Sequence, residues 1–248
     1  MRIAILDDEP VELSLLNKTL SFLKLPDGAM PICTMFSESP DLLRALKRET
    51  FDLIILDWQV PEISGLQMLK WIKMHLNPSP PVVMLTSRTG ERDVIQALEA
   101  GAIEYISKPF RQGELLARLK NVMRQQQTEP ASDNVQSFGN IRFDLQETQV
   151  SVDGVPASLT QREFELALLV FRNQGRPLSR SYLYEHLWGR DEQLSSRTLD
   201  THIYRIRNKL KLTSEFGWVL STVYGYGYRL EALDGSAPSD EELIDIED

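Results

Sequence analysis

Two stretches, Met1-Arg2-Ile3-Ala4-Ile5-Leu6-Asp7-Asp8 and Phe51-Asp52-Leu53-Ile54-Ile55-Leu56-Asp57, decide the fold. Each contains a short apolar run that ends in one or two carboxylates. An apolar run of this length without alternation is typical of a strand buried on both faces. Three further runs have strand length, at Ile32–Phe36, Val82–Leu85 and Ile103–Ile106.

Segments of helical periodicity separate these apolar runs. Leucines recur at spacings of three and four at Leu13, Leu16, Leu20 and Leu23, and the pattern returns at Leu66–Leu76 and Leu115–Val122. Buried strands alternating with amphipathic helices indicate a parallel sheet that is covered on both faces. We therefore predict a doubly wound, five-stranded α/β domain over residues 1–123.

The composition places the chain among globular proteins. Its 248 residues are 42% hydrophobic and 25% charged, a length that suits two domains of common size. The one cysteine, Cys33, excludes an intrachain disulfide and a cysteine-based zinc site. No apolar run approaches the roughly 18 residues of a membrane span, and the first residues do not resemble a signal peptide. We expect a soluble protein of a reducing compartment, the cytoplasm.

The second half has a different pattern. Residues 124–137 (RQQQTEPASDNVQS) are polar and aperiodic, which predicts a flexible linker. Short alternating stretches follow at Ile141–Phe143 and Gln149–Val152, with Asp153-Gly154 as a hairpin turn.

Three helices and a terminal hairpin complete this half. A capping box at Thr160–Glu163 opens the first helix, Ser179 caps the second, which stops at Gly189, and the third begins near Ser195–Arg197. The segment Trp218–Leu230 reads as two strands around a Gly225–Gly227 turn. This order of elements predicts a winged helix-turn-helix domain over residues 138–231.

The net charge of −9 hides an asymmetry. Residues 134–230 carry 12 basic and 10 acidic side chains, whereas 231–248 carry 8 acidic and no basic ones. We expect the stretch 232–248 to be a disordered acidic tail, or else a competitor of DNA for the basic residues of the third helix.

Polar residues follow four of the five predicted strands: Asp7-Asp8, Asp57, Thr86-Ser87 and Lys108. Functional groups of an open parallel sheet gather at the carboxyl ends of its strands. Three converging acids favour a divalent cation, and oxygen ligands select Mg²⁺. Such a site suits phosphoryl transfer to a carboxylate.

Residues 1–125 resemble the receiver domain of bacterial two-component response regulators. The likeness rests on Asp7-Asp8-Glu9, on Asp57 with Pro61 and Gly65, on Thr86-Ser87, Gly101-Ala102 and Tyr105, and on Lys108-Pro109-Phe110. The resemblance implies that Asp57 accepts phosphate from a sensor histidine kinase. It also implies that Asp7, Asp8, Asp57 and the Gln59 backbone carbonyl hold Mg²⁺. Thr86 and Lys108 would contact the phosphoryl group, and Tyr105 resembles the switch aromatic.

The third helix of the second half has two distinct faces. Leu199, Ile203, Ile206 and Leu210 form an apolar stripe, which places Arg197, Thr201, Tyr204 and Asn208 on the opposite face. Such side chains address base edges and phosphates in the major groove. Three other arginines, Arg172, Arg176 and Arg180, are expected to be ordinary solvated residues.

Residues 138–230 resemble the winged-helix effector domain of the OmpR/PhoB family. The matching pieces are Leu159-Thr160, Glu163–Leu166, Leu178–Arg180, Trp188-Gly189, Arg197–Leu210 and Gly225–Arg229. By position, Arg197, Thr198, His202, Arg207 and Tyr228 would contact phosphates, and Thr201, Tyr204 and Arg205 would face bases. Tyr224 stands where this family commonly has a minor-groove arginine.

Active receivers of this family pair through their fourth helix, fifth strand and fifth helix. Glu104, Glu114 and Arg118 keep the charged pattern of that face, whereas Val94 and Ile103 replace charged partners. The expected protein is a bacterial transcription regulator that forms homodimers on phosphorylation and binds tandem half-sites of double-stranded DNA. RNA polymerase is a further candidate partner. The protein is not expected to be an enzyme beyond an intrinsic autophosphatase activity. We expect Gln59 and Arg88 to set the rate of that dephosphorylation.

Three alternatives remain at this point. The receiver would serve only as a dimerisation module in a phosphorylation-independent DNA binder. The second half would be an enzymatic output, although it offers no nucleophile–base set and no phosphate-binding glycine loop. Or the winged helix would be a protein–protein adaptor that has lost DNA binding.

Overall fold

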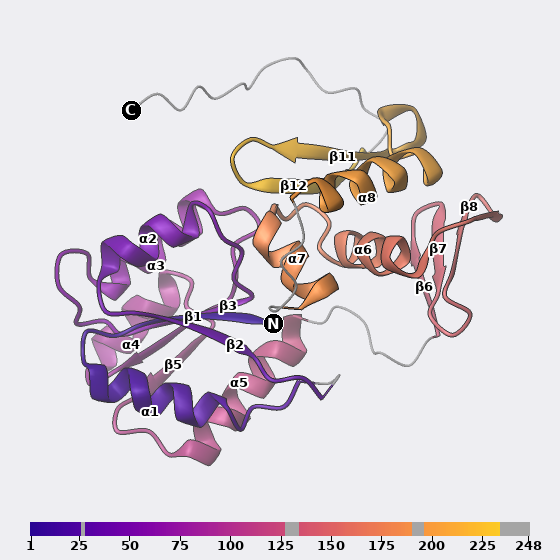
Figure 1. Ribbon diagram of the computed structural model, residues 1–248. Coiled ribbons are helices and arrows are strands. Elements are labelled where there is room, and N and C mark those ends of the chain that lie inside the picture. The colour runs from indigo at the N-terminus through magenta and orange to yellow at the C-terminus, as the bar shows by residue number, and fades with distance from the viewer. Residues whose placement is uncertain (26–27, 127–133, 190–195, 234–248) are drawn as a thin grey trace.

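The computed structural model describes residues 1–25, 28–126, 134–189 and 196–233. They form two domains that lie side by side, with α7 of the second facing the sheet of the first (Figure 1). The predicted tail at 232–248 lies outside the described residues, apart from its first two positions. Within the described ranges, no helix has both the length and the apolar character to cross a membrane.

The N-terminal domain is built on a five-stranded parallel sheet in the order β2-β1-β3-β4-β5. The strands β1, β3 and β4 are buried at every residue, which explains why their sequences show no alternation. The five strands are β1 (Arg2–Leu6), β2 (Ile32–Phe36), β3 (Leu53–Leu56), β4 (Val82–Thr86) and β5 (Glu104–Ser107).

Helices cover both faces of this sheet and create two hydrophobic cores. One core contains the leucines of α1 and α5, and the other contains side chains of α2, α3 and α4. The predicted doubly wound domain is confirmed, although α2 and α4 were not identified from periodicity. The helices are α1 (Pro10–Leu20), α2 (Ser39–Leu46), α3 (Gly65–His75), α4 (Glu91–Glu99) and α5 (Gln112–Gln126).

Gly65 is required where α3 begins. A Cβ atom at this position would lie 1.9 Å from the backbone oxygen of Asp57, well inside van der Waals contact. The Gly65 amide also donates to the carbonyl of Trp58 at 3.0 Å. The start of α3 is therefore packed directly against the backbone that carries Asp57.

The C-terminal domain is a winged helix, as predicted. A four-stranded antiparallel sheet precedes three helices, and β10, β12 and β11 form a second, three-stranded sheet. Its elements are β6 (Val135–Phe138), β7 (Ile141–Asp144), β8 (Gln149–Val152), β9 (Val155–Ala157), α6 (Gln161–Arg172), β10 (Leu178–Ser179), α7 (Arg180–Trp188), α8 (Ser196–Lys209), a 3₁₀ turn (Ser214–Phe216), β11 (Trp218–Val223) and β12 (Gly227–Ala232).

Local signals in this half of the chain form as expected. Asp153 and Gly154 both have positive φ, 51° and 76°, as a tight hairpin turn requires. The capping box of Thr160 and Glu163 is present, and the Ser179 hydroxyl accepts from the amide of Tyr182. The predicted linker 124–137 is longer than the connection between elements, because α5 continues to Gln126 and β6 begins at Val135.

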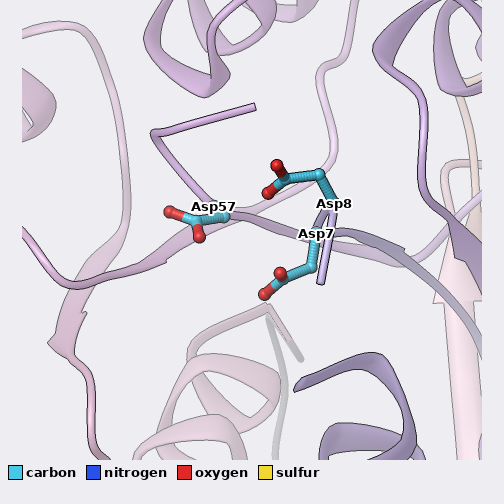
Figure 2. A group of neighbouring side chains, drawn as sticks. All are labelled: Asp7, Asp8 and Asp57. Atoms are coloured by element: carbon cyan, nitrogen blue, oxygen red, sulfur yellow. The ribbon is translucent and has the colours of Figure 1, made fainter. Parts of the chain in front are cut away.

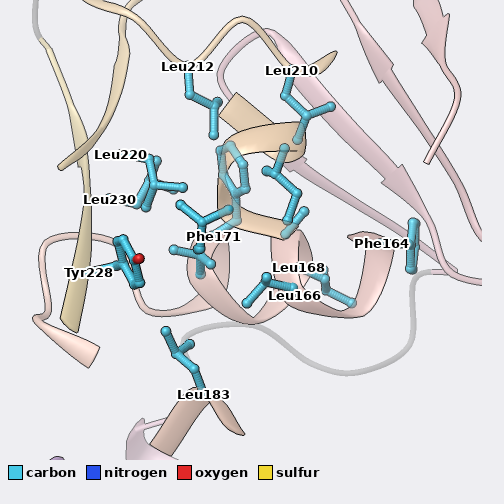
Figure 3. Close-up of a cluster of buried hydrophobic side chains, with 14 of the residues drawn as sticks. Phe164, Leu166, Leu168, Phe171, Leu183, Leu210, Leu212, Leu220, Tyr228 and Leu230 are labelled. Atoms are coloured by element: carbon cyan, nitrogen blue, oxygen red, sulfur yellow. The ribbon is translucent and has the colours of Figure 1, made fainter. Parts of the chain in front are cut away.

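One hydrophobic core joins the elements of the winged helix (Figure 3). The predicted apolar stripe of α8 is buried in it, with exposed fractions of 1% or less at Leu199, Ile203, Ile206 and Leu210. Phe164 and Phe171 of α6 and Leu220 and Leu230 of the wing strands pack into the same core. The opposite face of α8 is therefore held outward.

The prediction that Arg176 is an ordinary solvated residue is wrong, whereas Arg180 keeps a side chain that is 39% exposed. Arg176 Nη1 donates to Asp52 Oδ1 of the N-terminal domain at 3.0 Å, and only 18% of its side chain is exposed. Arg180 contacts Asp200 of α8 and Tyr228 of the wing. Both arginines look like surface residues in sequence because their partners lie far away along the chain.

Candidate functional site

Three carboxylates meet at the carboxyl ends of neighbouring strands (Figure 2). Asp7 and Asp8 follow β1, and Asp57 follows β3, which pairs with β1 in parallel. One oxygen from each residue lies within 4.8 Å of the others. Asp7 and Asp57 are buried and Asp8 is exposed, so the cluster, called the pocket below, is open to solvent on the side of Asp8.

Lys108 closes the inner side of this pocket. Its Nζ donates to Asp7 Oδ2 at 2.6 Å and to Asp57 Oδ2 at 2.7 Å. The second oxygen of each aspartate accepts a backbone amide, from Glu9 to Asp7 Oδ1 and from Gln59 to Asp57 Oδ1, both at 3.1 Å. Both buried carboxylates are thus oriented by the chain itself.

The charges in the pocket are not balanced. Burial raises the pKa of Asp7, and the hydrogen bond and charge of Lys108 offset this only in part, while the neighbouring Asp57 adds to the rise. Burial alone would lower the pKa of Lys108, but its hydrogen bonds to Asp57 and Asp7 raise that pKa. One lysine stands beside three acids and bonds to two of them, and the excess negative charge favours a cation.

Oxygen donors in this arrangement fit Mg²⁺. Carboxylates and carbonyls are the ligands that hard divalent cations prefer, and Mg²⁺ sites commonly keep an open side for water or phosphate. The exposed Asp8 gives the cluster such an open side. The sequence predicted these three residues correctly as neighbours.

Thr86 and Tyr105 both form hydrogen bonds with the backbone of Arg88. Thr86 ends β4 and is fully buried, and its hydroxyl accepts from the amide of Arg88 at 3.4 Å. The Tyr105 hydroxyl donates to the backbone oxygen of Arg88 at 2.7 Å. Arg88 therefore joins the predicted phosphoryl-contacting residue to the predicted switch residue through its backbone.

Side chains on the open side of the pocket are held by neighbouring groups. The Ser87 hydroxyl donates to Gln59 Oε1 at 2.9 Å. Arg88 Nη1 lies 2.8 Å from Asp93 Oδ1 of α4, and its guanidinium lies 5.1 Å from the ring centre of Trp58. The side chains of Gln59 and Arg88 thus bond to neighbouring groups, while the backbone amide of Gln59 bonds to Asp57.

The outward face of α8 forms the second candidate site. Arg197, Thr201, Tyr204, Arg205 and Asn208 are all exposed there. Tyr204 has 65% of its surface exposed, and the Arg205 side chain 53%. The wing carries Tyr224 fully exposed at its turn. A helix and a hairpin that present such groups together fit a groove and the adjoining backbone of duplex DNA.

Other predicted DNA-contacting residues make contacts within the domain. Arg207 Nε donates to the Leu220 carbonyl at 2.7 Å, and its guanidinium lies over the ring of Tyr228. Tyr228 is buried, and its hydroxyl donates to Asp200. Thr198 and His202 are half-buried, and burial lowers the pKa of His202. Arg207 and Tyr228 hold α8 against the wing and leave less of themselves to face a ligand.

Glu163 is a functional neighbour that sequence reasoning did not identify. It was predicted only as part of a capping box, yet its carboxylate lies 2.7 Å from Lys209 Nζ and 3.7 Å from Arg205 Nη1 of α8. The residue is completely buried. Its partners are more than forty positions away, so no local signal reveals them.

The predicted pairing face of the first domain contains an internal ion-pair cluster. Arg118 of α5 lies 3.2 Å from Glu104 of β5 and 2.9 Å from Glu114 of its own helix. Val94 and Ile103 are half-buried, and Ile95 and Leu98 of α4 are exposed. The face thus combines a charged cluster on β5 and α5 with apolar side chains on α4.

Comparisons with known proteins agree with this geometry. Residues 3–120 match the family "Response regulator receiver domain", and residues 154–230 match "Transcriptional regulatory protein, C terminal". The chain is 35% identical to the sensory transduction protein RegX3 of Mycolicibacterium smegmatis, over 86% of this chain and 92% of that protein.

Two further comparisons cover most of the chain. The phosphate regulon transcriptional regulatory protein PhoB of Pseudomonas aeruginosa is 37% identical, over 72% of this chain and 77% of PhoB. The crystal structure of the response regulator DrrB of Thermotoga maritima, an OmpR/PhoB homologue, matches at 28% identity with a TM-score of 0.42, over 93% of this chain and 99% of that one. Because both domain families match in this order, and the relatives match across both, the chain belongs to the OmpR/PhoB family of two-component response regulators.

Proposed function

We propose that this two-component transcriptional regulator is switched in the cytoplasm by phosphorylation of Asp57. The observation that carries the proposal is the position of the Asp57 carboxylate between the Lys108 ammonium and the Gln59 amide, beside two further acids. A carboxylate fixed in this way can attack phosphorus in line with the leaving group.

The donor in this proposal is the phosphohistidine of a sensor kinase. An oxygen of Asp57 forms a bond to phosphorus as the nitrogen–phosphorus bond breaks, and the departing imidazole takes up a proton. Lys108, already bonded to Asp57 Oδ2, is placed to contact the transferred group. Mg²⁺ held by Asp7, Asp8, Asp57 and the Gln59 carbonyl supplies charge neutralisation when bound.

The link from Asp57 to the rest of the domain runs through the loop after β4. A phosphoryl oxygen would draw the Thr86 hydroxyl away from the Arg88 amide that it now accepts from. Because Tyr105 donates to the carbonyl of the same Arg88, movement of this loop changes the contact of Tyr105. Two arrangements of one loop would therefore separate the active from the inactive state.

Removal of the phosphoryl group requires water to reach it from the open side of the pocket. Gln59 and Arg88 flank that side, and the side chain of Arg88 is held back by Asp93 and Trp58. We expect both to set the lifetime of the acyl phosphate. Gln59→Ala and Arg88→Ala should each change the hydrolysis rate of phosphorylated protein, and unchanged lifetimes in both would remove this role.

The output proposed for the second domain is duplex DNA binding through α8 and the wing. Arg197, Thr201, Tyr204 and Arg205 are the exposed residues offered to the DNA, with Tyr224 at the wing. Two phosphorylated receivers would pair through the face of α4, β5 and α5, and two winged helices would then bind tandem half-sites. Pairing raises occupancy through effective concentration without new base contacts.

The deciding experiment incubates the purified chain with acetyl phosphate and Mg²⁺ and records its intact mass. We expect a gain of one phosphoryl group, its absence in Asp57→Asn, and its retention in Asp41→Asn, which changes an aspartate on α2 away from the pocket. An unchanged mass of the wild-type chain would refute phosphorylation at Asp57. The family matches do not favour the alternative function, a phosphorylation-independent DNA binder whose receiver serves only for dimerisation.

A further inference from the structure

The two domains contact each other through a cluster of polar side chains, which we call the docking cluster. It lies at the amino ends of β1 and β3, opposite to the pocket at their carboxyl ends. From the first domain it contains Arg2, Glu49, Thr50 and Asp52. From the second it contains Arg176, Ser179, Ser181, Tyr182 and Tyr226.

Three sets of hydrogen bonds and ion pairs form this cluster. The first is centred on Asp52, whose Oδ1 accepts from Arg176 at 3.0 Å and from the Tyr182 hydroxyl at 2.9 Å. Its Oδ2 accepts the backbone amide of Arg2 at 2.7 Å. Arg176 additionally donates to the carbonyl of Phe51 at 2.6 Å. One carboxylate thus joins the starts of β1 and β3 to the second domain.

The second set joins Thr50 to Ser179 in a reciprocal manner. The Thr50 amide donates to Ser179 Oγ at 3.1 Å, and the Ser179 amide donates to Thr50 Oγ1 at 2.7 Å. Tyr226 of the wing turn reaches the Thr50 hydroxyl at 3.0 Å. In the third set, Arg2 Nη1 lies 2.7 Å from Glu49 Oε2 and donates to Ser181 Oγ at 3.3 Å.

Four of these polar residues are buried, and the others are partly buried. The exposed fractions are 7% for Arg2, 3% for Thr50, 1% for Ser179 and 4% for Tyr182. Buried polar groups stabilise a contact when all are bonded, and leaving a partner without its bond costs free energy. The docking cluster therefore favours a single relative orientation of the two domains.

The docked orientation leaves the DNA-facing groups uncovered. Tyr204 and Arg205 are more than half exposed, and Tyr224 is fully exposed, although the receiver contacts α7 and the neighbouring Tyr226. Figure 1 shows α7 between the receiver and α8. Docking thus fixes the orientation of the winged helix without covering its recognition residues.

The effect of docking on DNA binding follows from the symmetry of the paired receivers and of the bound winged helices. Paired receivers in a closed dimer are related by a two-fold axis, whereas winged helices on tandem half-sites point the same way along the DNA. The orientation of the winged helix relative to its own receiver must then differ between the two protomers. At most one protomer keeps the docking cluster, and this step rests on the pairing set out under Proposed function.

We propose that the docking cluster is a latch that limits cooperative binding to tandem DNA sites while leaving binding to a single site unaffected. Only the fraction of molecules with an open latch can supply the second winged helix of a pair. The apparent affinity for tandem DNA falls in proportion to that fraction. Binding to one half-site uses α8 and the wing, which are free in the docked form.

A reversible crosslink tests the latch in the full-length chain. Thr50→Cys and Ser179→Cys are combined in a Cys33→Ala background, because their reciprocal bonds set the two side chains next to each other, as a disulfide requires. The oxidised and the reduced forms of this one protein serve as the matched pair. The probes are duplexes with one and with two direct copies of a site enriched from random-sequence DNA by the acetyl-phosphate-treated wild-type chain.

We expect reduced, phosphorylated protein to bind the two-copy duplex about a hundredfold more tightly than the one-copy duplex. Oxidation should reduce this gain to about twofold, the statistical advantage of two sites, and leave one-copy affinity unchanged. Failure of the disulfide to form would refute the docked contact. An unchanged gain after oxidation, or a loss of one-copy affinity, would refute the latch. Absence of the gain in phosphorylated wild-type protein would instead refute the pairing itself.

Discussion

Two buried carboxylates, one in each domain, contact a lysine at almost the same distance, yet their pKa values move in opposite directions. Lys108 lies 2.6 Å from Asp7, and Lys209 lies 2.7 Å from Glu163. Burial raises the pKa of Asp7. Burial acts on Glu163 in the same sense, but the hydrogen bonds from Lys209 and the Thr160 amide outweigh it, and the pKa of Glu163 falls.

The difference lies in how many acids share one cation. Lys108 serves Asp7 and Asp57 together, with Asp8 nearby, whereas Glu163 has Lys209 to itself and Arg205 at 3.7 Å. The pocket keeps an excess of negative charge that a metal ion can neutralise. The site around Glu163 is already compensated and serves to position α8. A buried acid–lysine pair is thus part of a candidate cation site in one domain and a structural support in the other.

The largest expected effect comes from the backbone that shapes the pocket. Gly65→Ala places a methyl group 1.9 Å from the Asp57 carbonyl oxygen, so either α3 or the Asp57 loop must move. We expect a loss of about 3 kcal/mol or more in the unfolding free energy of the receiver, measured by urea denaturation. Gly113→Ala, which meets nothing within 4 Å, is the control and should not destabilise the chain.

Addition of Mg²⁺ should distinguish the two carboxylate sites. At a free concentration of about a hundred times its Kd, Mg²⁺ should stabilise the receiver by about 2.7 kcal/mol, while the winged helix gains nothing. Thermal unfolding followed by probes in each domain measures both. Asp8→Asn, which removes an exposed acid of the cluster, should shrink the gain, and an equal shift in both domains would contradict a pocket-specific site.

Removal of the charge of Glu163 should weaken the winged helix and strengthen its attraction to DNA. Glu163→Gln keeps a capping side chain but loses the charged bonds to Lys209, at an expected cost of about 1.5 kcal/mol in unfolding free energy. The released Lys209 should steepen the logarithmic salt dependence of DNA affinity by about one unit. Glu165→Gln, at an exposed surface pair with Arg162, should change neither by a comparable amount.

The smallest effect concerns pH. Because the pKa of Glu163 in the folded protein lies below its ordinary value of 4.5, its contribution to stability is complete above that value and is lost as the pH falls through the lowered pKa. The stability difference between wild type and Glu163→Gln should therefore be constant near neutrality and narrow below pH 4.5. A stability difference that widened as the pH fell would contradict a lowered pKa of Glu163 in the folded protein.

Sequence reasoning succeeded where chemistry is tied to the end of a regular element. Asp7 and Asp57 each follow a buried strand directly and Thr86 ends one, so a pattern of a few residues places them at one edge of the sheet. The stripe of α8 was equally predictable, because helical spacing alone separates Leu199 from Tyr204. The same local reasoning recovered both helix caps.

Contacts between distant residues could not be predicted in this way. Asp52 and Arg176 are separated by 124 positions, and each has the local pattern of a solvated surface residue. The family resemblance implied that Arg207 contacts DNA phosphate, but the wing strand beside it accepts its hydrogen bond. Such partners depend on how finished elements pack together, which short sequence windows do not record.

The bond between Asp52 and Arg176 has a practical consequence for protein engineering. Hybrid regulators are made by joining one receiver to a foreign output module at the linker. Exchange of either module here would leave Asp52 or Arg176 facing an unrelated surface, and the hybrid would lose this contact between its domains. A chimaera that keeps the contact needs Arg2, residues 49–52, residues 176–182 and Tyr226 as a matched set.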